Sequence, residues 1–366
     1  MNERVPRGGP AAPRLVLDGR WLPFGGAGRT TELLLRALAL TESPHQWVLW
    51  GPPELARWAF PGAELAPTSA DPRAWNGQRQ WFDVPDADLT VYLHQQRPLR
   101  RTPSVTLVYD TIPLHFTANP VLRRSIQLFL RRVGTISDRI LTLSEYSRSC
   151  IERELGVPAG RISVLGLPAD DELAQRVLAM RSRLPRADVA LYVGRFAAHK
   201  NLSRLVAAFG RTDFAGAGGR LLLVGGTEAE LAELAGRLSP AEREMVELRG
   251  TCPQEELERL LATCLFVVQP SLEEGFGLPT WEAQTCGVPV CVSDGGSLPE
   301  TTLGFVRPFP ATSAESMTAA LDACAAEARE LGPADAAERS DAFRAKAPTL
   351  RQFGDRFLGA VAPLVG

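Results

Sequence analysis

The chain has 366 residues, with 40 basic and 42 acidic side chains and a net charge of −2 at pH 7. This length is too great for one ordinary hydrophobic core and predicts two domains of about 150 to 200 residues each. Its contents of 45% apolar and 22% charged residues are typical of a globular protein. No apolar run approaches the ~20 residues that span a bilayer. The balanced charge, without interleaved basic and aromatic residues, argues against nucleic-acid binding.

The cysteines and the N-terminal segment bear on the cellular compartment. Six cysteines are scattered without Cys-x-x-Cys spacing, which favours reduced thiols over disulfides or a zinc site. Residues 1–13 lack the apolar centre of a signal peptide and are expected to form a frayed leader. We therefore expect a cytoplasmic protein that holds no metal.

In the first half of the chain, β-rich runs alternate with helical patterns. A strand at 14–18 is followed by a glycine-bearing turn at 25–28 and a helix at 30–38. Further strands are expected at 46–50, 89–93, 105–109 and 139–143. A helix at 120–133 carries arginines around an apolar stripe of Leu122, Ile126, Phe129 and Val133. This pattern allows weak contact with an anionic membrane or an acidic acceptor, and a solvated amphipathic helix is the simpler and preferred interpretation.

The second half alternates more strictly. Strands are expected at 188–194, 220–225, 245–249, 264–269 and 288–292, and helices at 201–210, 228–237, 254–263, 279–286 and 313–329. Such alternation predicts an α/β protein with doubly wound parallel sheets. A domain boundary is expected near 167–186, dividing the chain into a first domain (1–170) and a second (171–348). A last helical segment occupies 349–366.

One predicted junction between a strand and a helix, at 270–283, concentrates groups that suit a ligand. It contains Glu274 in the loop, glycines at 275 and 277, Pro279 near the helix start and Glu282 near the first helical turn. Glycines let backbone amides approach a ligand closely, and a helix N-terminus favours phosphate or hydroxyl oxygens. The alternative for such a loop alone is a tight turn with two solvated acids.

A second junction, at 194–201, carries two cations. Arg195 follows the strand at 188–194, and Lys200 precedes the helix at 201–210. Open α/β sheets bind ligands outside the carboxyl ends of their strands. The chain contains only two lysines, Lys200 and Lys346, against 38 arginines. A lysine in that background indicates a need for a compact ammonium donor, although a surface lysine is the alternative.

These two junctions resemble the signature of family 4 retaining glycosyltransferases of the GT-B fold. Seven residues that include Gly-Phe-Gly-Leu-Pro separate Glu274 from Glu282, and Cys286-Gly-Val-Pro-Val290 and Ser293-Asp-Gly-Gly-Ser-Leu-Pro-Glu300 follow in the family's order. Gly194-Arg195 with His199-Lys200-Asn201 resembles the family's diphosphate-binding pair. The resemblance implies two doubly wound Rossmann-like domains facing across a cleft, the first on the acceptor side, with the last helix crossing back to it.

The resemblance also implies an activity and a set of site residues. A hexose would pass from a nucleotide diphosphate sugar to a hydroxyl acceptor with retention of configuration, without a metal or other cofactor. The acceptor would be a polysaccharide or glycolipid intermediate, or a natural product. Catalytic roles fall to Glu274, Arg195 and Lys200. Donor-binding roles fall to Gly275, Phe276, Gly277, Leu278, Glu282, Gly26 and Thr251, and acceptor-side roles to Tyr109 and Asp110.

Within that set, Glu282 is expected to hold the nucleotide ribose and Glu274 the donor sugar. The two cations are expected to stabilise the leaving diphosphate. Tyr109 stands where many relatives have histidine, and tyrosine cannot shuttle a proton near neutral pH. Three isolated histidines, His45, His94 and His115, are assigned structural roles. A GT-B epimerase or phosphorylase, or a non-catalytic partner that binds nucleotide sugars, stays open as an alternative.

Overall fold

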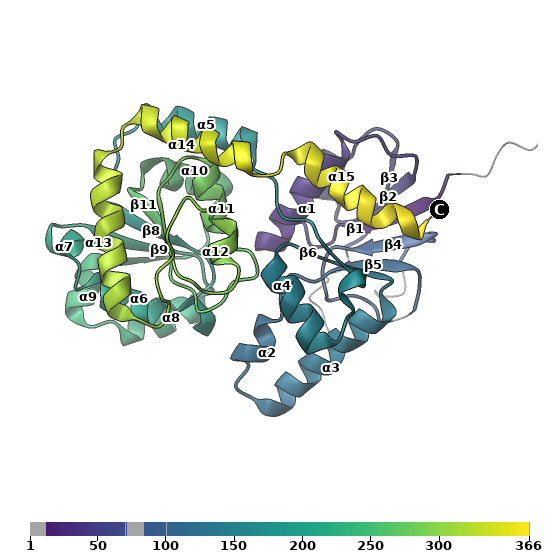
Figure 1. The fold of residues 1–366 in the computed structure, drawn as a ribbon, viewed down its shortest axis with the longest axis horizontal. Coiled ribbons are helices and arrows are strands. Elements are labelled where there is room, and N and C mark those ends of the chain that lie inside the picture. The colour runs from purple at the N-terminus through teal and green to yellow at the C-terminus, as the bar shows by residue number, and fades with distance from the viewer. Residues whose placement is uncertain (1–11, 70, 72–83, 100, 366) are drawn as a thin grey trace, which may run out of the picture.

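The computed structural model describes residues 12–69, 71, 84–99 and 101–365, so most of the expected leader lies outside the described residues. Two α/β lobes lie side by side, each built on a parallel sheet covered by helices (Figure 1). This confirms the expected class of two Rossmann-like domains. Across the described ranges, no helix is both long enough and apolar enough to cross a membrane.

The N-terminal domain has a sheet with the strand order β3-β2-β1-β4-β5-β6-β7, in which every neighbouring pair is parallel. Its strands are β1 (Arg14–Asp18), β2 (Gln46–Gly51), β3 (Ala63–Pro67), β4 (Leu89–Tyr92), β5 (Ser104–Leu107), β6 (Arg139–Thr142) and β7 (Ile162–Val164). Its helices are α1 (Gly25–Leu38), α2 (Ile112–Phe116), α3 (Pro120–Ile136) and α4 (Glu145–Cys150).

The C-terminal domain repeats this topology with the order β10-β9-β8-β11-β12. Its strands are β8 (Val189–Val193), β9 (Arg220–Val224), β10 (Val246–Arg249), β11 (Phe266–Gln269) and β12 (Val290–Val292). Its helices are α5 (Asp171–Arg181), α6 (Leu202–Phe209), α7 (Asp213–Gly216), α8 (Glu228–Arg237), α9 (Pro240–Met245), α10 (Gln254–Thr263), α11 (Leu278–Thr285), α12 (Leu298–Thr301), α13 (Ala314–Glu330) and α14 (Pro333–Lys346).

In both sheets the chain reverses its direction of winding between two central strands. These strands are β1 and β4 in the first sheet, and β8 and β11 in the second. At such a point the loops that leave the carboxyl ends of the two strands diverge and open a crevice, which is where doubly wound sheets bind ligands. The two expected ligand junctions, 194–201 and 270–277, are the loops after β8 and β11.

The last helix, α15 (Leu350–Val361), returns to the N-terminal domain (Figure 1). Phe353 and Phe357 are fully buried in the core cluster that includes the leucines of α1, and the Phe357 ring lies 6.2 Å from that of Trp47. The chain therefore crosses between the domains twice. The two crossings touch, because the amide of Ala169 donates to the carbonyl of Pro348.

Some expected boundaries are wrong in detail. The segment 25–28 is the first turn of α1 and not a separate turn, because residues 19–24 already turn the chain back from β1. Gly28 packs closely against this turn, since a Cβ there would lie 2.1 Å from the Leu22 carbonyl oxygen. Helix α11 begins at Leu278, so Glu282 lies in its second turn. The edge strand β3, the three-residue β7, α5 and α14 were not predicted from the sequence. These elements have weak periodicity or exposed faces.

Replacing Phe357 with alanine should destabilise the fold, because the ring fills a site in the shared core of α15 and the N-terminal domain. Removal of a buried phenylalanine costs about 3–5 kcal/mol. Denaturant unfolding of Phe357→Ala, followed by circular dichroism, measures this loss. Asp355→Ala, at an exposed position of the same helix, serves as the control. Equal unfolding midpoints for the two variants would show that α15 does not stabilise the domain.

Candidate active site

The loops after β8 and β11 bring Lys200 and Glu274 into contact. The ammonium Nζ of Lys200 lies 2.6 Å from Oε1 of Glu274. Asn201, in the left-handed conformation with φ 60°, donates from its side-chain amide to the carbonyls of Pro270 and Ala311. That amide holds the two loops together. The lysine and the glutamate, 74 residues apart in sequence, therefore meet where the sheet reverses.

Glu274 is buried, with 6% of its surface exposed. Its Oε1 also accepts hydrogen bonds from Gln269 Nε2 at 2.6 Å and Ser271 Oγ at 2.7 Å. Burial by itself would raise the pKa of this carboxyl group, but the charge and hydrogen bond of Lys200 and the Ser271 hydroxyl hold the pKa below its ordinary value. Glu274 is therefore an ionised carboxylate held in a fixed orientation at neutral pH.

Two helix N-termini lie beside this pair. Helix α11 starts after Gly277, whose φ of 84° favours glycine, and α1 starts after Phe24; neither N-cap residue supplies a side-chain cap. The starts of the two helices face each other, since a Cβ at Gly26 would lie 3.9 Å from Leu278 Cδ2. Uncapped amides at a helix N-terminus bind anions. Two predicted donor-side residues, Gly26 and Leu278, thus come together from different domains.

Glu282 lies in an ion-pair network that joins the domains. Arg29 of α1 donates from Nε to Glu282 Oε1 at 2.8 Å and is also paired with Asp170. Burial raises the pKa of Glu282, and the charge of Arg29 only partly offsets this. Burial opposes ionisation of Asp170 as well, but bonds from Arg36 and the charge of Arg29 lower its pKa to about 2. Sequence reasoning gave Arg29 no such role, because its partners are 141 and 253 residues away.

The glutamate before Glu274 forms a second bridge between the domains. Glu273 Oε2 lies 2.6 Å from Nδ1 of His115, and Glu273 Oε1 accepts from the Tyr146 hydroxyl at 2.9 Å. Nε2 of His115 lies 3.1 Å from Glu154. Burial would lower the pKa of His115, but its two carboxylate neighbours raise it. Sequence reasoning passed over Glu273, and no local signal distinguishes it from a solvated acid.

Tyr109 and Asp110 contact the glycine loop from the N-terminal domain. A Cβ at Gly275 would lie 2.9 Å from Asp110 Cβ and 3.0 Å from the Tyr109 carbonyl oxygen, so only glycine fits there. Ser144 and Ser147 donate their hydroxyls to the Gly275 carbonyl at 2.7 and 3.1 Å. Burial, with a smaller contribution from the charge of Glu274, raises the pKa of Asp110 to about 6.

The wall behind Tyr109 is aromatic. The Trp21 ring, on the loop after β1, stacks on His94, after β4, at 3.7 Å, and the His94 ring lies 5.6 Å from Tyr109. The Nδ1 of His94 accepts from the amide of Gln96. Burial lowers the pKa of His94 to about 3, so the ring is neutral. The loops of the first sheet's reversal point thus present an aromatic surface with little charge beside the glycine loop.

Two other predicted residues lie outside the Lys200–Glu274 contact. The Arg195 side chain is 75% exposed and pairs with Glu230 at 3.0 Å. Thr251 is exposed on the loop after β10, an edge strand two positions from β8. Phe276 is buried, and its ring lies 5.1 Å from that of Trp281. Among the described residues, no cluster of three or more His, Cys, Asp or Glu side chains is placed to hold a metal.

This loop arrangement matches a known family. Residues 181–324, which include both loops, match the family described as glycosyl transferases group 1. The match lies within the C-terminal domain of this chain. The chain is 34% identical over 169 residues to O-antigen chain mannosyltransferase B of Escherichia coli, covering 44% of each chain. It is 30% identical over 186 residues to MMP alpha-(1->4)-mannosyltransferase of Mycolicibacterium hassiacum, covering 46% of this chain and 40% of that protein.

The matched segments thus span less than half of either of these curated relatives, whereas solved structures match along the whole chain. HepE of Anabaena in complex with UDP and glucose superposes with a TM-score of 0.69 at 17% identity, covering 96% of this chain and 100% of that one. WaaG, a glycosyltransferase involved in lipopolysaccharide biosynthesis, gives a TM-score of 0.66 at 16% identity, covering 95% and 99%. At this identity the likeness shows the fold, which is GT-B, as the resemblance implied.

Replacing Lys200 with methionine should destabilise the protein most at neutral pH. The change leaves the buried Glu274 carboxylate without its cation, which costs about 3–5 kcal/mol. In the wild type the pKa of Glu274 is lowered, so its ionised form stabilises the fold above the ordinary glutamate pKa, and this contribution is lost as the pH falls. In the variant burial raises that pKa, and protonation relieves the penalty. The stability difference should therefore shrink between about pH 7 and pH 4.

Denaturant unfolding of both proteins at several pH values measures this difference. The chain supplies a matched control in Lys346→Met, because Lys346 is its only other lysine and lies exposed on α14. The free energy of unfolding of Lys346→Met should differ little from that of the wild type at any pH. A Lys200→Met penalty that does not change with pH would show that Glu274 is not the group responsible.

Proposed function

We propose that this chain is a glycosyltransferase that moves a hexose from a nucleotide diphosphate sugar to a hydroxyl acceptor, with retention of configuration and without a metal. The observation that carries the proposal is the Lys200–Glu274 pair on the loops after β8 and β11, the second of which leads into the uncapped N-terminus of α11. A cation and free backbone amides suit a diphosphate, and an oriented carboxylate suits a sugar with developing positive charge. The family of the C-terminal domain and the names of its relatives support this activity.

In the proposed reaction, the bond between the sugar C1 and the diphosphate oxygen breaks while the acceptor oxygen bonds to C1 on the same face. The leaving diphosphate accepts the acceptor's proton, so no protein base is needed. Lys200 and the α11 amides stabilise the charge that builds on the diphosphate. Glu274 orients the sugar and stabilises its positive charge, and the amides of Gly275, Phe276 and Gly277 contact the sugar hydroxyls.

Two contacts would have to exchange when the donor binds. Arg195 is paired with Glu230 at an exposed site, and such pairs contribute only about 0–1 kcal/mol, so a diphosphate can draw the guanidinium away. Glu282, proposed to bind the ribose, is held by Arg29 of the other domain. Its release would part the two domains at this point. Donor entry is therefore coupled to opening of the cleft.

The aromatic wall of Trp21, His94 and Tyr109, together with Asp110, is proposed to face the acceptor. Neutral rings suit the apolar faces of a sugar, and Asp110 can accept a hydroxyl hydrogen bond when ionised. Both curated relatives named above are mannosyltransferases, which makes mannose the first donor sugar to test. Thr251 and Gly26 stay assigned to the donor side as part of this proposal.

The reaction class is tested by incubating the full chain with a panel of nucleotide sugars and detecting free nucleoside diphosphate. Release that requires an added acceptor indicates transfer, conversion of the nucleotide sugar without acceptor indicates an epimerase, and binding without turnover indicates a non-catalytic partner. The anomeric proton signal of the product tests retention. Unchanged turnover in the presence of a chelator tests independence from metal.

Replacing Glu274 with glutamine should lower turnover while nucleoside diphosphate still binds. The amide keeps the size of the side chain but loses the negative charge, and loss of one such electrostatic group costs about two to three orders of magnitude in rate. Steady-state kinetics and calorimetry on the same preparation separate the two effects. Glu228→Gln, at an exposed position in the same domain, is the control. Turnover of Glu274→Gln within a few-fold of wild type would exclude the proposed role.

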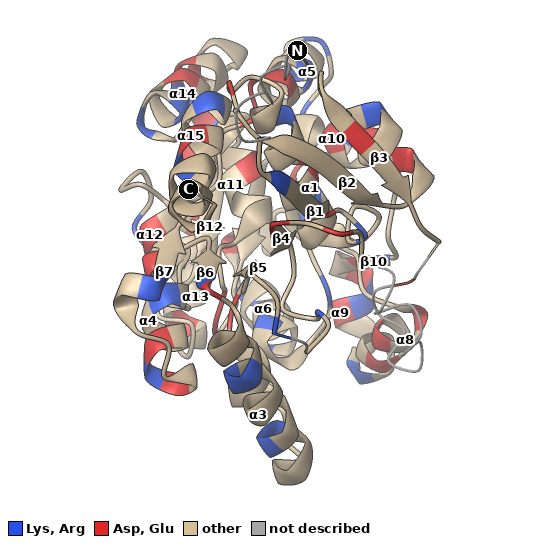
Figure 2. Ribbon diagram, turned by 90° about the vertical axis from the view of Figure 1, so that its right-hand side faces the viewer, with Lys and Arg blue, Asp and Glu red and all other residues tan. Residues whose placement is uncertain are grey.

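We also propose weak peripheral contact of α3 with an anionic membrane surface. The C-terminal part of its apolar stripe packs into the N-terminal domain, with Val133 fully buried. Its first turns instead expose Val121 and Leu122, at 74% and 53%, and Leu128, at 52%. Arginines at 123, 124, 131 and 132 are exposed on the same helix, which projects from the body of the molecule (Figure 2). Exposed apolar side chains among arginines suit a lipid interface.

The double variant Val121→Ser/Leu122→Ser should bind vesicles containing anionic phospholipid several-fold more weakly than the wild type. Both side chains are exposed, so the change removes apolar contact without disturbing the core. Cosedimentation at low and high salt measures the binding, which salt should also weaken. Leu40→Ser, at a similarly exposed leucine on another surface, is the control. Equal binding by both variants would exclude α3 as the contact.

A further inference from the structure

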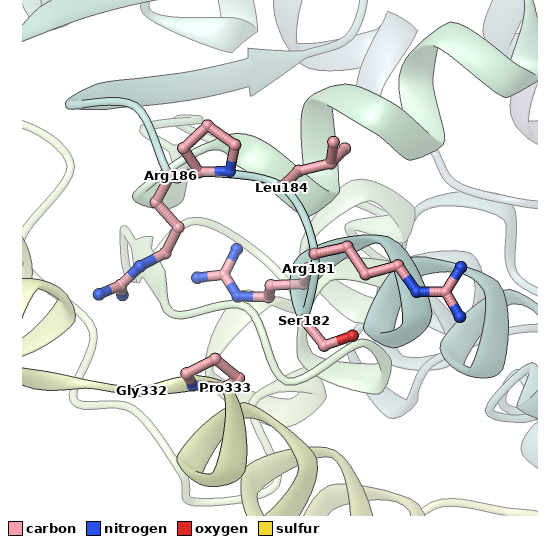
Figure 3. A pocket seen from close by; sticks show the side chains of 8 residues that line it. Arg181, Ser182, Leu184, Arg186, Gly332 and Pro333 are labelled. Carbon is pink, nitrogen blue, oxygen red and sulfur yellow. The ribbon is translucent and has the colours of Figure 1, made fainter.

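A pocket of about 370 Å³ lies far from the candidate active site and is lined by arginines. It is formed by the segment between α5 and β8 and by the start of α14; its lining residues are Arg181, Ser182, Arg183, Leu184, Pro185, Arg186, Gly332 and Pro333. Figure 3 shows Gly332 and Pro333 across the pocket from Leu184 and Arg186. The segment precedes β8 and Lys200 follows it, so the pocket and the cleft lie at opposite ends of that strand.

Within the part of the chain that the structure describes, Arg181 is a buried cation without a carboxylate partner. Only 5% of its surface is exposed. Its Nη1 donates to the carbonyls of Leu261, Ala262 and Cys264 at 3.4, 3.2 and 3.1 Å. Burial lowers the pKa of Arg181, and the positive charges of Arg186 and Arg339 lower it further. The carbonyls satisfy hydrogen bonds at Nη1, but they do not neutralise the charge.

The other two arginines add to this charge. Arg186 donates to the carbonyls of Ala328 and Arg329 at the end of α13, and Arg183 is exposed at the mouth. Among the lining residues, none is acidic. Two acids near the rim are engaged elsewhere, because Asp335 accepts from the Gly332 amide and Asp188 pairs with Arg329. Arg181, Arg183 and Arg186 therefore line one cavity that has no lining carboxylate.

Such a cavity is electrostatically incomplete. A buried cation without a counter-ion is costly, and three like charges repel one another. Guanidinium groups match phosphate oxygens in geometry and charge. A bound phosphate would offset the repulsion and could accept hydrogen bonds from the arginines. A pocket of this size holds a phosphate together with part of the molecule that carries it.

We propose that this pocket is a second anion site, which binds the phosphate group of a phosphomonoester or diphosphate separately from the catalytic cleft. The proposal does not depend on the reaction assigned to the cleft. The phosphate can belong to a soluble metabolite or to a lipid headgroup, because the arginines recognise the same chemistry in both.

The test is calorimetric titration of the full chain with inorganic phosphate and with pyrophosphate. Each anion is titrated into the Lys200→Ala variant, in which the proposed diphosphate site of the cleft is weakened. Each anion is also titrated into the triple variant Lys200→Ala/Arg183→Gln/Arg186→Gln. Arg183 is exposed and Arg186 partly exposed, so the fold should survive, and thermal melts check this. The control is the variant Lys200→Ala/Arg259→Gln, because Arg259 is an exposed arginine of the same domain.

The expected result is saturable binding to Lys200→Ala and to the Arg259→Gln control, and at least a tenfold weaker affinity after the double change. Phosphate should also raise the melting temperature of the first two proteins more than that of the third. Vesicles containing phosphatidic acid identify a lipid source if their binding falls with the double change and is unaffected by Val121→Ser/Leu122→Ser. Absence of binding to Lys200→Ala, or equal affinities with and without the pocket arginines, would overturn the proposal.

Discussion

The rest of the site depends on keeping the Glu274 carboxylate ionised inside the protein. A buried carboxylate is stable only with a cation and hydrogen-bond donors around it. Lys200 supplies the cation, Gln269 and Ser271 supply donors, and Asn201 fixes the loop that carries the lysine. Each of these groups lies on or next to a loop at the reversal point of the second sheet, so the pairing of β8 with β11 determines the distance between cation and carboxylate.

The contacts between the domains include polar bonds to carboxylates of the C-terminal domain, beside the apolar packing of Phe276, Trp281 and Phe343 in the core cluster of the N-terminal domain. Glu273 contacts His115 and Tyr146, Glu282 contacts Arg29, and Glu300 accepts from the backbone amides of Glu145 and Tyr146. Water or a ligand can replace such bonds, whereas a hydrophobic interface would have to expose apolar surface on opening. The covalent crossings at 165–170 and 347–349 keep the domains together while these polar contacts exchange. The polar contacts can therefore exchange without exposing apolar surface, while the apolar cluster and the two crossings hold the domains together.

The arginine-lined pocket and the cleft use the same domain in different ways. In the cleft, the cation is paired with a carboxylate and lies beside uncapped helix N-termini. In the pocket, Arg181 is held by backbone carbonyls, and its charge has no acidic neighbour in the cavity lining. Positive charge is thus compensated from within the chain at one end of β8, and at the other end it is available to an external anion.

The sequence by itself determined what is encoded over short distances. Buried β-rich runs alternating with helical patterns predicted two doubly wound domains, and both ligand loops were located because glycines, a helix start and charged residues follow each other within about ten residues. The match of residues 181–324 to a glycosyltransferase family confirms that the signature is local. Short or edge strands such as β3 and β7 were not predicted, because three to five residues with little periodicity form too weak a pattern.

Only the tertiary structure decided which charges meet. Nothing near Glu282 in sequence indicates that Arg29, 253 residues away, would neutralise it, and nothing near Glu273 indicates His115. The same holds for the aromatic stack of Trp21 on His94, which requires β1 and β4 to be neighbours. Arg195 illustrates the converse: sequence placed it beside Lys200, yet its side chain pairs with Glu230. The orientation of a long side chain depends on partners from distant segments, and a linear pattern does not contain them.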